Sequence, residues 1–468
     1  MLSETVHIKT STQALRKVPR AKGIPVIGNT LDALRDPLGF MVSLRENYED
    51  VVTIHVGGKN YVVIQSPDAC RHILQENAKN YCKPGAARMM KRVMGEGLAT
   101  SNGDLWLKQR RMMQPAFHRK KTESLFCTIN EETKHLAESL KKAPPGKSIN
   151  LGQAFQQLTL INITKTMFGR DVRNDVKTIA AVINELIDSA SSIITSLVKV
   201  PLAIPTPGNL RFSRAMKKFD KIIYDIIEGR KSSNSETSGD LLDMLLSAYD
   251  HQSNSGMSDQ QLKDEITTIF MAGHETTAQT LGWVFYQLAM NRKVYKQVRS
   301  ESQAYFSNGD YSGLEKLVIT KSVIEETMRL YPPVWVIARK AIADDNVNGF
   351  LVPANSTILI NIYGMNHSSR YWTSPALFNP ARFDDESERP QAFSNLSFGG
   401  GQRQCIGKLF AMMVMQTVVG LLVQQFEFEV PAGFEPVKEP GTTLRARGGI
   451  QMLLKGNVKM RKCENVKI

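Results

Sequence analysis

Apolar residues along the chain recur mostly with helical spacing, and two short runs near the amino end depart from this pattern. Val51 to Val56 and Tyr61 to Ile64 are rich in β-branched residues and are separated by Gly-Gly-Lys-Asn. Two such runs around a short glycine-containing linker predict a β-hairpin. Helical spacing then continues to about residue 335, and the last third adds short strands at 356–362 and 449–454. The pattern predicts a mainly α-helical fold with small β-sheets.

The longest helix is expected between Ser258 and about Asn291. Ser258 and Gln261 have the spacing of a capping box, which satisfies backbone donors at a helix start. Small and apolar residues then recur every three or four positions, namely Leu262, Ile266, Ile269, Gly273, Thr276, Thr280 and Val284. Such a helix would be about 50 Å long, so we expect it to cross the centre of the molecule.

Composition describes a globular chain with a basic surface. Of 468 residues, 42% are hydrophobic and 22% are charged, which is enough to build a large core. The net charge of +14 suits an acidic partner or an anionic membrane surface. No run of about 18 consecutive apolar residues is present, so no transmembrane anchor is expected. We expect a soluble, cytoplasmic protein.

The five cysteines do not suggest a disulfide framework. They are odd in number and widely scattered, at Cys70, Cys82, Cys127, Cys405 and Cys463. Small secreted domains show even sets at close spacing, whereas a reducing compartment leaves thiols free. A chemical role for one particular cysteine is therefore open.

The most specific motif surrounds Cys405. The segment from Phe398 to Gly407 contains three consecutive glycines and an arginine before the cysteine, and an apolar helical run follows at 409–423. Backbone N–H groups and the dipole at a helix start favour a thiolate and lower its pKa. A buried structural cysteine in a tight turn is the alternative. The glycines also suggest a phosphate loop, but the Gly-Lys-Ser/Thr ending is missing.

A second motif, Ala272-Gly273-His274-Glu275-Thr276-Thr277, lies in the middle of the long expected helix. Gly273 leaves room for a ligand, and Glu275 and Thr276 place a carboxylate and a hydroxyl where they could relay protons. A zinc-protease motif would need a histidine at the position of Ala278, so that interpretation fails. A mid-helix threonine bonded back to a carbonyl is the structural alternative.

Two further pairs each share one helix face. Glu326 and Arg329 have i, i+3 spacing, and Pro332 follows closely and ends that helix. Trp106 and Arg110 have i, i+4 spacing and could together hold an anionic group. The alternatives are a surface ion pair contributing about 0 to 1 kcal/mol, and a packed indole beside a solvated guanidinium.

In order and separation these motifs resemble the haem-thiolate monooxygenases of the cytochrome P-450 superfamily. The resemblance runs from Pro19 to the end of the chain and includes Pro380-Ala381-Arg382-Phe383, where Ala381 replaces a frequent glutamate. It implies a mainly α fold with small β-sheets (α+β), a triangular prism with haem between the central helix and the cysteine-loop helix. A polar extension at 1–18 would precede one haem-binding domain at 19–468. A soluble bacterial member is expected.

The resemblance also implies which residues bind the cofactor. Cys405 becomes the proximal ligand of the iron in haem b (iron protoporphyrin IX), and its anionic sulfur favours O–O cleavage. Gly401 and Gly407 let the backbone approach the porphyrin. The other cofactor-binding residues are Trp106, Arg110, Arg339, Phe398, Arg403 and Gly407, among which the tryptophan and arginines pair with the propionates. Glu326, Arg329 and Arg382 form a buried structural triad.

Catalytic and substrate residues follow in the same way. Thr276 matches the distal threonine of the family and Glu275 its acidic neighbour, which together guide protons to oxygen. The expected apolar pocket includes Met89, Met90, Leu98, Ile269, Ala272, Val336 and Ile337. Methionine fills irregular space, so a fatty acid, terpenoid, steroid or polyketide-like substrate fits. Core packing explains many of the same residues.

The implied reaction inserts one oxygen atom from O2 into a C–H or C=C bond of an apolar small molecule. Electrons would come from a ferredoxin or flavodoxin-type donor with its reductase. A basic docking face could consist of Lys108, Arg110, Arg111, Arg119, Lys120, Lys121 and Lys408, although a solvated charge run explains them equally. We expect a monomer and no nucleic acid partner.

Two rival functions use the same residues. A haem-thiolate peroxygenase, isomerase or dehydratase would consume peroxides without a reductase, but such enzymes tend to lack the acid–threonine pair present at Glu275 and Thr276. A binding, sensor or structural protein without turnover is the second rival. Turnover with peroxide alone separates the first rival from a monooxygenase.

Overall fold

The computed structural model describes residues 15–84, 88–144, 146–195, 200–232, 239–250, 255–307, 309–384 and 391–457. For residues 88, 89, 194, 195, 249, 250, 255, 456 and 457 within these ranges, the description covers the backbone alone. Helices dominate, and the sheets are small, as the sequence predicts. The four cysteines that fall in these ranges are free, and Cys463 lies outside them.

The α-helices are α1 (Thr30–Arg35), α2 (Pro37–Asn47), α3 (Pro67–Arg71), α4 (Arg88–Met94), α5 (Gly103–Met113), α6 (Arg119–Ser124), α7 (Phe126–Lys141), α8 (Leu151–Phe168), α9 (Val176–Thr195), α10 (Pro207–Ser232), α11 (Leu241–Leu246), α12 (Asp259–Met290), α13 (Arg292–Tyr305), α14 (Tyr311–Leu314), α15 (Val318–Leu330), α16 (Ile362–Asn366) and α17 (Lys408–Gln425). Shorter helical turns include the π-helix η1 (His72–Glu76) and the 3-10 turns η2 (Ala78–Asn80), η4 (Gln114–Phe117), η5 (Pro380–Phe383) and η6 (Gly401–Arg403).

The strands are β1 (Arg16–Lys17), β2 (Val51–Val56), β3 (Lys59–Ile64), β4 (Tyr81–Cys82), β5 (Ser148–Asn150), β6 (Tyr249–Asp250), β7 (Ser255–Gly256), β8 (Ile337–Ala341), β9 (Asp345–Val347), β10 (Phe350–Val352), β11 (Thr357–Ile360), β12 (Phe426–Glu429), β13 (Lys438–Pro440), β14 (Leu444–Ala446) and β15 (Gln451–Asn457). The expected hairpin is confirmed as β2 and β3, which pair in antiparallel register.

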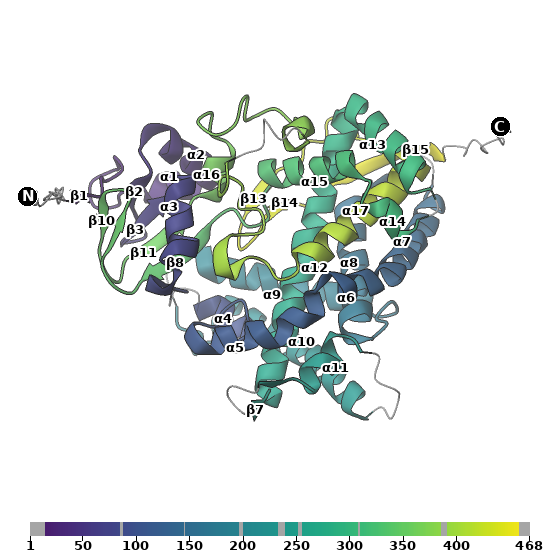
Figure 1. Cartoon of the computed structure of the whole chain (residues 1–468), viewed down its shortest axis with the longest axis horizontal. Coiled ribbons are helices and arrows are strands. Elements are labelled where there is room, and N and C mark those ends of the chain that lie inside the picture. Colours follow the sequence, from purple (N-terminus) through teal and green to yellow (C-terminus); the bar gives the residue numbers. More distant parts are fainter. Residues whose placement is uncertain are drawn as a thin grey trace, which may run out of the picture.

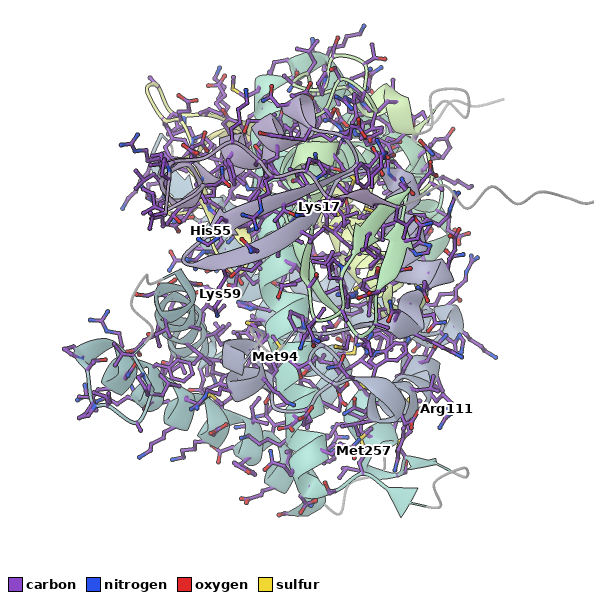
Figure 2. The ribbon with its side chains drawn as sticks, turned by 90° about the vertical axis from the view of Figure 1, so that its left-hand side faces the viewer. Lys17, His55, Lys59, Met94, Arg111 and Met257 are labelled. Carbon is purple, nitrogen blue, oxygen red and sulfur yellow. The ribbon has the colours of Figure 1, made fainter. Side chains whose placement is uncertain are left out.

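The largest sheet combines strands from residues 51–82 with strands from residues 337–360. Its strand order is β2-β3-β11-β8-β4, and β3 pairs in parallel with β11, with Val62 opposite Ile358 and Ile64 opposite Ile360. Smaller sheets have the orders β1-β10-β9, β12-β15-β5, β13-β14 and β6-β7. The largest sheet lies with α1, α2 and α3 at one end of the molecule (Figure 1). Figure 2 labels His55 of β2 and Lys59 of β3 in this sheet, and Lys17 of β1 in the sheet β1-β10-β9.

The long helix is confirmed as α12, which crosses the middle of the molecule (Figure 1). It begins where the sequence predicts, because the Ser258 hydroxyl accepts a hydrogen bond from the Gln261 backbone N–H at 3.2 Å. The reciprocal bond of the predicted capping box is not seen among the described residues. One serine cap is therefore enough to fix the start of this helix.

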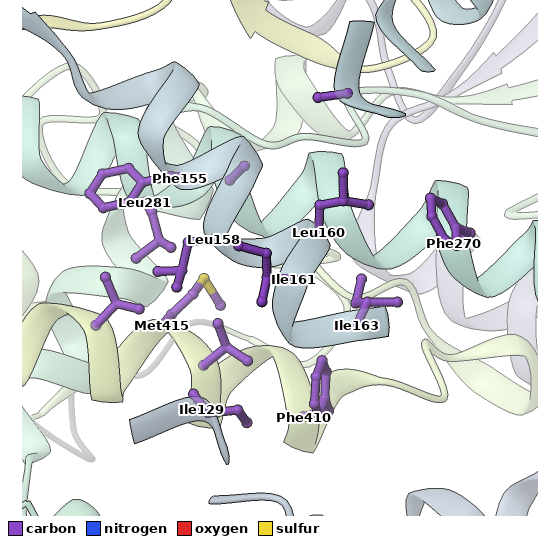
Figure 3. Close-up of a cluster of buried hydrophobic side chains, with 14 of the residues drawn as sticks. Ile129, Phe155, Leu158, Leu160, Ile161, Ile163, Phe270, Leu281, Phe410 and Met415 are labelled. Carbon is purple, nitrogen blue, oxygen red and sulfur yellow. The ribbon is translucent and has the colours of Figure 1, made fainter. Parts of the chain in front are cut away.

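The main core lies where α8 packs between α12 and α17. Phe155 of α8 stacks on Phe285 of α12 with ring centroids 5.3 Å apart, and Met415 of α17 belongs to the same buried cluster (Figure 3). Burying aromatic side chains in this way contributes several kcal/mol to stability. This packing surrounds α12 on several sides, so any polar or open face on it needs a separate explanation.

In the described part of the chain, α17 is the one helix that is long and apolar enough to span a bilayer, and 67% of its most apolar window is buried. Its side chains join the main core. The apolar composition of α17 is therefore explained by packing inside the protein.

Candidate active site

The cysteine loop folds back on itself before α17. The Cys405 backbone N–H donates to the Phe398 carbonyl at 2.9 Å, and Gly407 is the residue just before α17 begins. The Cys405 side chain is open to solvent although protein atoms crowd around it, so it faces a hollow. The loop thus presents one thiol on the wall of an internal space.

The thiol differs electrostatically from the sequence prediction. Desolvation raises the pKa of Cys405, and this outweighs the lowering by the Gly407 N–H and by the charges of Arg110 and Lys408. The expectation of a lowered pKa was therefore wrong for the free thiol, because the hollow excludes much of the water that would stabilise the thiolate. Coordination to a metal would deprotonate it.

Gly401 has a different purpose from the one predicted. Its φ is +64°, and a Cβ at this position would lie 1.8 Å from the Leu74 carbonyl oxygen of η1. The glycine lets η6 pack against η1, and the expectation that its backbone turns close to a porphyrin stays a prediction. A Cβ on Gly407 would lie 4.0 Å from the Cys405 sulfur, which is ordinary contact. Phe398 packs against the main core, beneath the Lys408 side chain.

Three cations gather beside the cysteine loop. Desolvation lowers the pKa of Arg403 of η6 to about 10. Desolvation and the charge of Arg403 lower the pKa of Arg339 of β8 to about 10, and desolvation with the charges of Arg339 and Arg403 lowers the pKa of Lys83 to about 7. None of the three has an ion pair with a carboxylate in the described residues. Arg339 is buried, whereas Lys83 and Arg403 are half-buried. Cations removed from water without a carboxylate partner are costly, so this cluster favours an anionic ligand.

Trp106 and Arg110 both reach the cysteine loop but do not converge on one point. Arg403 stacks over the Trp106 ring at 4.3 Å from its centroid and donates to the Ser101 carbonyl at 3.0 Å. Arg110 donates instead to the Gln404 carbonyl at 3.0 Å, near Cys405. Trp106 therefore belongs with the cation cluster, whereas Arg110 braces the loop.

One face in the middle of α12 is open, although most neighbouring residues of the helix are buried. Ile269, Ala272 and Thr276 keep accessible surface, while Phe270, Met271 and other neighbours on α12 are buried. The Thr276 hydroxyl donates to the Ala272 carbonyl at 2.7 Å, which is the mid-helix arrangement that the sequence left as the alternative. Its partly exposed position still allows the hydroxyl to meet a ligand.

Gly273 keeps some accessible surface beside Ala272, but a side chain there would point toward α8. A Cβ there would lie 2.8 Å from the Ile163 Cδ1 atom of α8. The missing side chain lets α8 approach α12, so the glycine has a packing role, and room for a ligand at Gly273 stays a prediction. Ala272 is the small residue that borders the open space.

Glu275 lies on another side of α12, next to Arg445 of β14. The Arg445 guanidinium is 3.9 Å from the Glu275 carboxylate and 2.8 Å from Asp188 of α9. Burial raises the pKa of Glu275, and Arg445 opposes that shift. Glu275 therefore belongs to a charge group that connects α9, α12 and β14.

The predicted triad is assembled as expected. Glu326 accepts from Arg329 Nε at 2.7 Å and from Arg382 Nε at 3.2 Å, and all three side chains are almost fully buried. Arg329 also donates to the carbonyls of Asn366 at 2.6 Å and Pro375 at 2.8 Å. These bonds join α15, α16 and η5, so the group stabilises the fold.

The predicted pocket residues fall into two groups. Met90, Leu98 and Ile269 pack at the edge of the helical core, whereas Val336 and Ile337 pack with the sheet clusters. The side chain of Met89 lies outside the described residues. The open face of α12 thus has Ile269 and Ala272 as its apolar members from the predicted set.

Sequence reasoning missed Lys83, Arg445 and Glu265. Glu265 of α12 is buried, and its carboxylate accepts a bond from the Leu98 N–H at 2.9 Å. Each of these residues gains its meaning from a partner more than 150 positions away, and no local motif identifies such a partner. A run of polar residues before Ile269 was the one available hint at Glu265.

The described structure combines an accessible thiol in the loop before α17, an open face on the long helix α12 and a group of cations beside the cysteine loop. The family model described as Cytochrome P450 matches residues 18–454. The chain therefore belongs to the cytochrome P450 family. The family binds haem b through a cysteine thiolate and contains monooxygenases, so the protein is an oxygenase that acts with O2, a substrate and redox partner proteins.

Individual relatives support this placement. Cyclooctat-9-en-7-ol 5-monooxygenase of Streptomyces melanosporofaciens is 30% identical over 90% of each chain. Protein LUTEIN DEFICIENT 5, chloroplastic, of Arabidopsis thaliana is 28% identical over 96% of this chain and 78% of that protein. Cytokinin hydroxylase of Arabidopsis thaliana is 30% identical over 77% of this chain and 72% of that protein.

The residues at the site fit haem. Its two propionates are anions that would pair with Lys83, Arg339 and Arg403, which have no carboxylate partner among the described residues. Cys405 offers a thiol beside them in the cysteine loop. Soft sulfur donors suit iron, and a thiolate ligand favours O–O cleavage. The cation cluster and the thiol are thus explained by one group.

Proposed function

We propose that this protein inserts one oxygen atom from O2 into a C–H or C=C bond of an apolar small molecule that lies against the open face of α12. The carrying observation is that Ile269, Ala272 and Thr276 are accessible on one side of the middle of α12, where most neighbouring residues of the helix are buried. A terpenoid, steroid, fatty acid or polyketide-like molecule would cover these apolar groups. The names of two relatives, a cyclooctatenol monooxygenase and a cytokinin hydroxylase, support an oxidised small organic molecule.

In this mechanism the chain positions the reactants and moves protons. Cys405 holds the iron, and Lys83, Arg339 and Arg403 with Trp106 hold the propionates. When bound, haem supplies the activation of O2. The Thr276 hydroxyl can turn from the Ala272 carbonyl and donate toward the hollow, and Glu275 can resupply the proton because burial raises its pKa. Arg445 keeps that carboxylate in place.

Electrons would come from a separate ferredoxin or flavodoxin-type donor with its reductase. Three exposed cations lie on α6, namely Arg119, Lys120 and Lys121. Helix α6 packs against α17, the helix that follows Cys405 in the chain. An acidic donor docked there would lie near the thiol side of the cofactor. We further propose that the protein works as a monomer in the cytoplasm.

Replacing Thr276 tests the proton role, and Thr280 provides a matched control. Both hydroxyls donate to the carbonyl four residues earlier, but Thr280 is buried and Thr276 is not. Thr276→Ala should lower product formed per electron consumed at least tenfold, whereas Thr280→Ala should leave that ratio unchanged. Equal ratios for both variants and the unmodified protein would remove Thr276 from the mechanism.

The oxygen source tests the reaction class. Product formed with isotopically labelled O2, reductant and donor should carry one labelled oxygen atom. A haem-loaded protein that forms product with peroxide alone, and none with O2 and reductant, would establish the peroxide-using alternative.

A further inference from the structure

A pair of acids in the first half of α12 holds the segment that precedes α5. Asp264 accepts from the Glu96 N–H at 2.8 Å, and Glu265 accepts from the Leu98 N–H at 2.9 Å. Met94, at the end of α4 and just before this segment, lies beside α12 (Figure 2). Main-chain N–H groups are therefore attached to consecutive side chains of the central helix.

Two glycines let the segment lie flat on α12. A Cβ on Gly95 would come within 2.1 Å of the Asp264 carboxylate, and one on Gly97 within 2.1 Å of the Thr268 hydroxyl oxygen. The Thr268 hydroxyl thus faces the same segment as the Glu265 carboxylate. Leu98, at the end of the contact, remains partly accessible.

Glu265 lies on the same helical line as the open face. Glu265, Ile269, Ala272 and Thr276 are separated by four, three and four residues, which keeps their side chains within about 40° of one direction. The rise from Glu265 to Thr276 is about 16 Å. Glu265 therefore continues the line of the open face beyond its accessible residues and is itself buried.

Two polar atoms at this far end have no partner in the described structure. They are Glu265 Oε1 and Thr268 Oγ1, on side chains 0% and 5% exposed. Desolvation raises the pKa of Glu265 to about 8. The hydrogen bond from the Leu98 N–H opposes this rise, and the charge of Asp264 adds to it. At neutral pH its carboxyl group is thus mostly protonated and can donate a hydrogen bond. Buried polar atoms are usually paired, so these two atoms, which lie on the same segment, offer a donor and an acceptor that a ligand hydroxyl can use.

We propose that Glu265 and Thr268 form the polar end of the substrate pocket and bind a hydroxyl group of an otherwise apolar substrate. The inference rests on the proposed function and narrows its substrate to an apolar alcohol about as long as the line from Glu265 to Thr276. The Glu265 acid donates to the alcohol oxygen, and the alcohol donates to the Thr268 oxygen. Oxidation then occurs at a carbon remote from that hydroxyl.

Matched ligands and variants test this site in the haem-loaded protein. The probes are 1-dodecanol and 1-fluorododecane, which differ in one hydrogen-bonding group, and binding is measured by equilibrium dialysis. The unmodified protein should bind the alcohol about tenfold more tightly. Thr268→Val should reduce this ratio to about threefold or less, and Glu265→Gln should keep most of it because an amide can still accept from Leu98 and donate.

Thr267→Val is the control variant. The Thr267 hydroxyl is also buried without a partner, but it points about 160° away from the line of Glu265. This variant should leave the ratio at about tenfold. If the unmodified protein binds 1-dodecanol and 1-fluorododecane equally, as it would if a buried water filled this place, the proposal is overturned. An affinity ratio that Thr268→Val leaves unchanged also overturns it. Incorporation of labelled O2 into product is measured separately. A failure of the hydroxyl-binding site can therefore be distinguished from a failure of the proposed monooxygenase reaction.

Discussion

Gly401 illustrates how much one residue decides about the cysteine loop. We predict that Gly401→Ala destabilises the protein by at least about 3 kcal/mol, because the methyl group would clash with the Leu74 carbonyl in addition to the strain of φ at +64°. Haem retention should fall as well, since Cys405 follows four residues later. Chemical denaturation and the haem content of the purified protein provide the measurement.

Gly433 supplies the control for that change. Its φ is +73°, and nothing lies within 4 Å of a Cβ placed there. Gly433→Ala should therefore cost about 1 to 2 kcal/mol from backbone strain alone. Equal losses for the two alanine variants would show that η1 and η6 can separate without penalty.

His274 makes stability depend on pH. Neither ring nitrogen has a partner in the described structure, and desolvation lowers its pKa to about 4, from about 6.5 in an unfolded chain. Because the unfolded state binds the proton more readily, stability should be full above pH 6.5 and fall as pH drops toward 4. The loss from this residue should be about 2 kcal/mol between pH 7 and pH 5.

His367 also has a pKa lowered to about 4, chiefly by burial, so the comparison needs a His274 variant. In His274→Leu, the decline of the denaturation free energy between pH 7 and pH 5 should be smaller by about 2 kcal/mol. A variant that keeps the full decline would show that His274 is not the titrating group.

At the residue scale, local motifs led to the triad around Glu326, whose contacts the structure shows, and to Cys405 and Thr276, whose roles stay predictions. They failed for Lys83 and Arg445, because the charges that give these residues meaning come from distant segments. The sign of the Cys405 pKa shift was also missed. It depends on how much water the surrounding chain excludes, which a ten-residue motif does not contain.

At the element scale, Glu301 of α13 supplies the cap that α15 lacks. Its carboxylate accepts from the backbone N–H groups of Ile319 at 2.6 Å and Thr320 at 2.9 Å, and from the Thr320 hydroxyl at 2.7 Å. Leu317, at the N-cap position, has no capping side chain. Glu301→Ala should therefore cost about 2 to 3 kcal/mol, measured by denaturation.

Two variants make the capping argument specific. Glu301→Gln keeps one acceptor oxygen and should lose about half as much as the alanine variant. Asp310→Ala removes an exposed N-cap from the short helix α14 and should cost about 1 kcal/mol. If Glu301→Ala cost no more than Asp310→Ala, the buried position of the Glu301 cap would be energetically irrelevant.

Elements with local signals were predictable, and elements held by distant pairing were not. The β2–β3 hairpin and the start of α12 follow from β-branched runs, glycines and the Ser258 cap. Strand β1 has two residues and exists because it pairs with β10, more than 300 positions away. The π-helix η1 likewise follows from its packing against η6, and its own sequence does not reveal it.

At the scale of the whole molecule, the net charge of +14 predicts how electrons arrive. Reduction by an acidic donor should slow at least about threefold between 0.1 M and 1 M salt, because the Debye length falls from about 10 Å to about 3 Å. Stopped-flow measurement of the reduction rate at several salt concentrations tests this expectation.

Charge reversal at single exposed lysines locates the docking face. Lys120→Glu on α6 should slow reduction at low salt, whereas Lys142→Glu, just after α7, should not. A rate that ignores both salt and Lys120→Glu would exclude electrostatic docking there, while the oxygen chemistry would be unaffected.

The parallel pairing of β3 with β11 has a consequence for synthesis of the protein. Ile64 leaves the ribosome about 300 residues before its partner Ile360, which at about 5 to 20 residues per second is a delay of about 15 to 60 s. Throughout that interval one edge of the nascent hairpin has no neighbour and can recruit foreign strands. Slower translation or a shortage of chaperones should therefore reduce the yield of native chains more than it would for a protein whose sheets close locally.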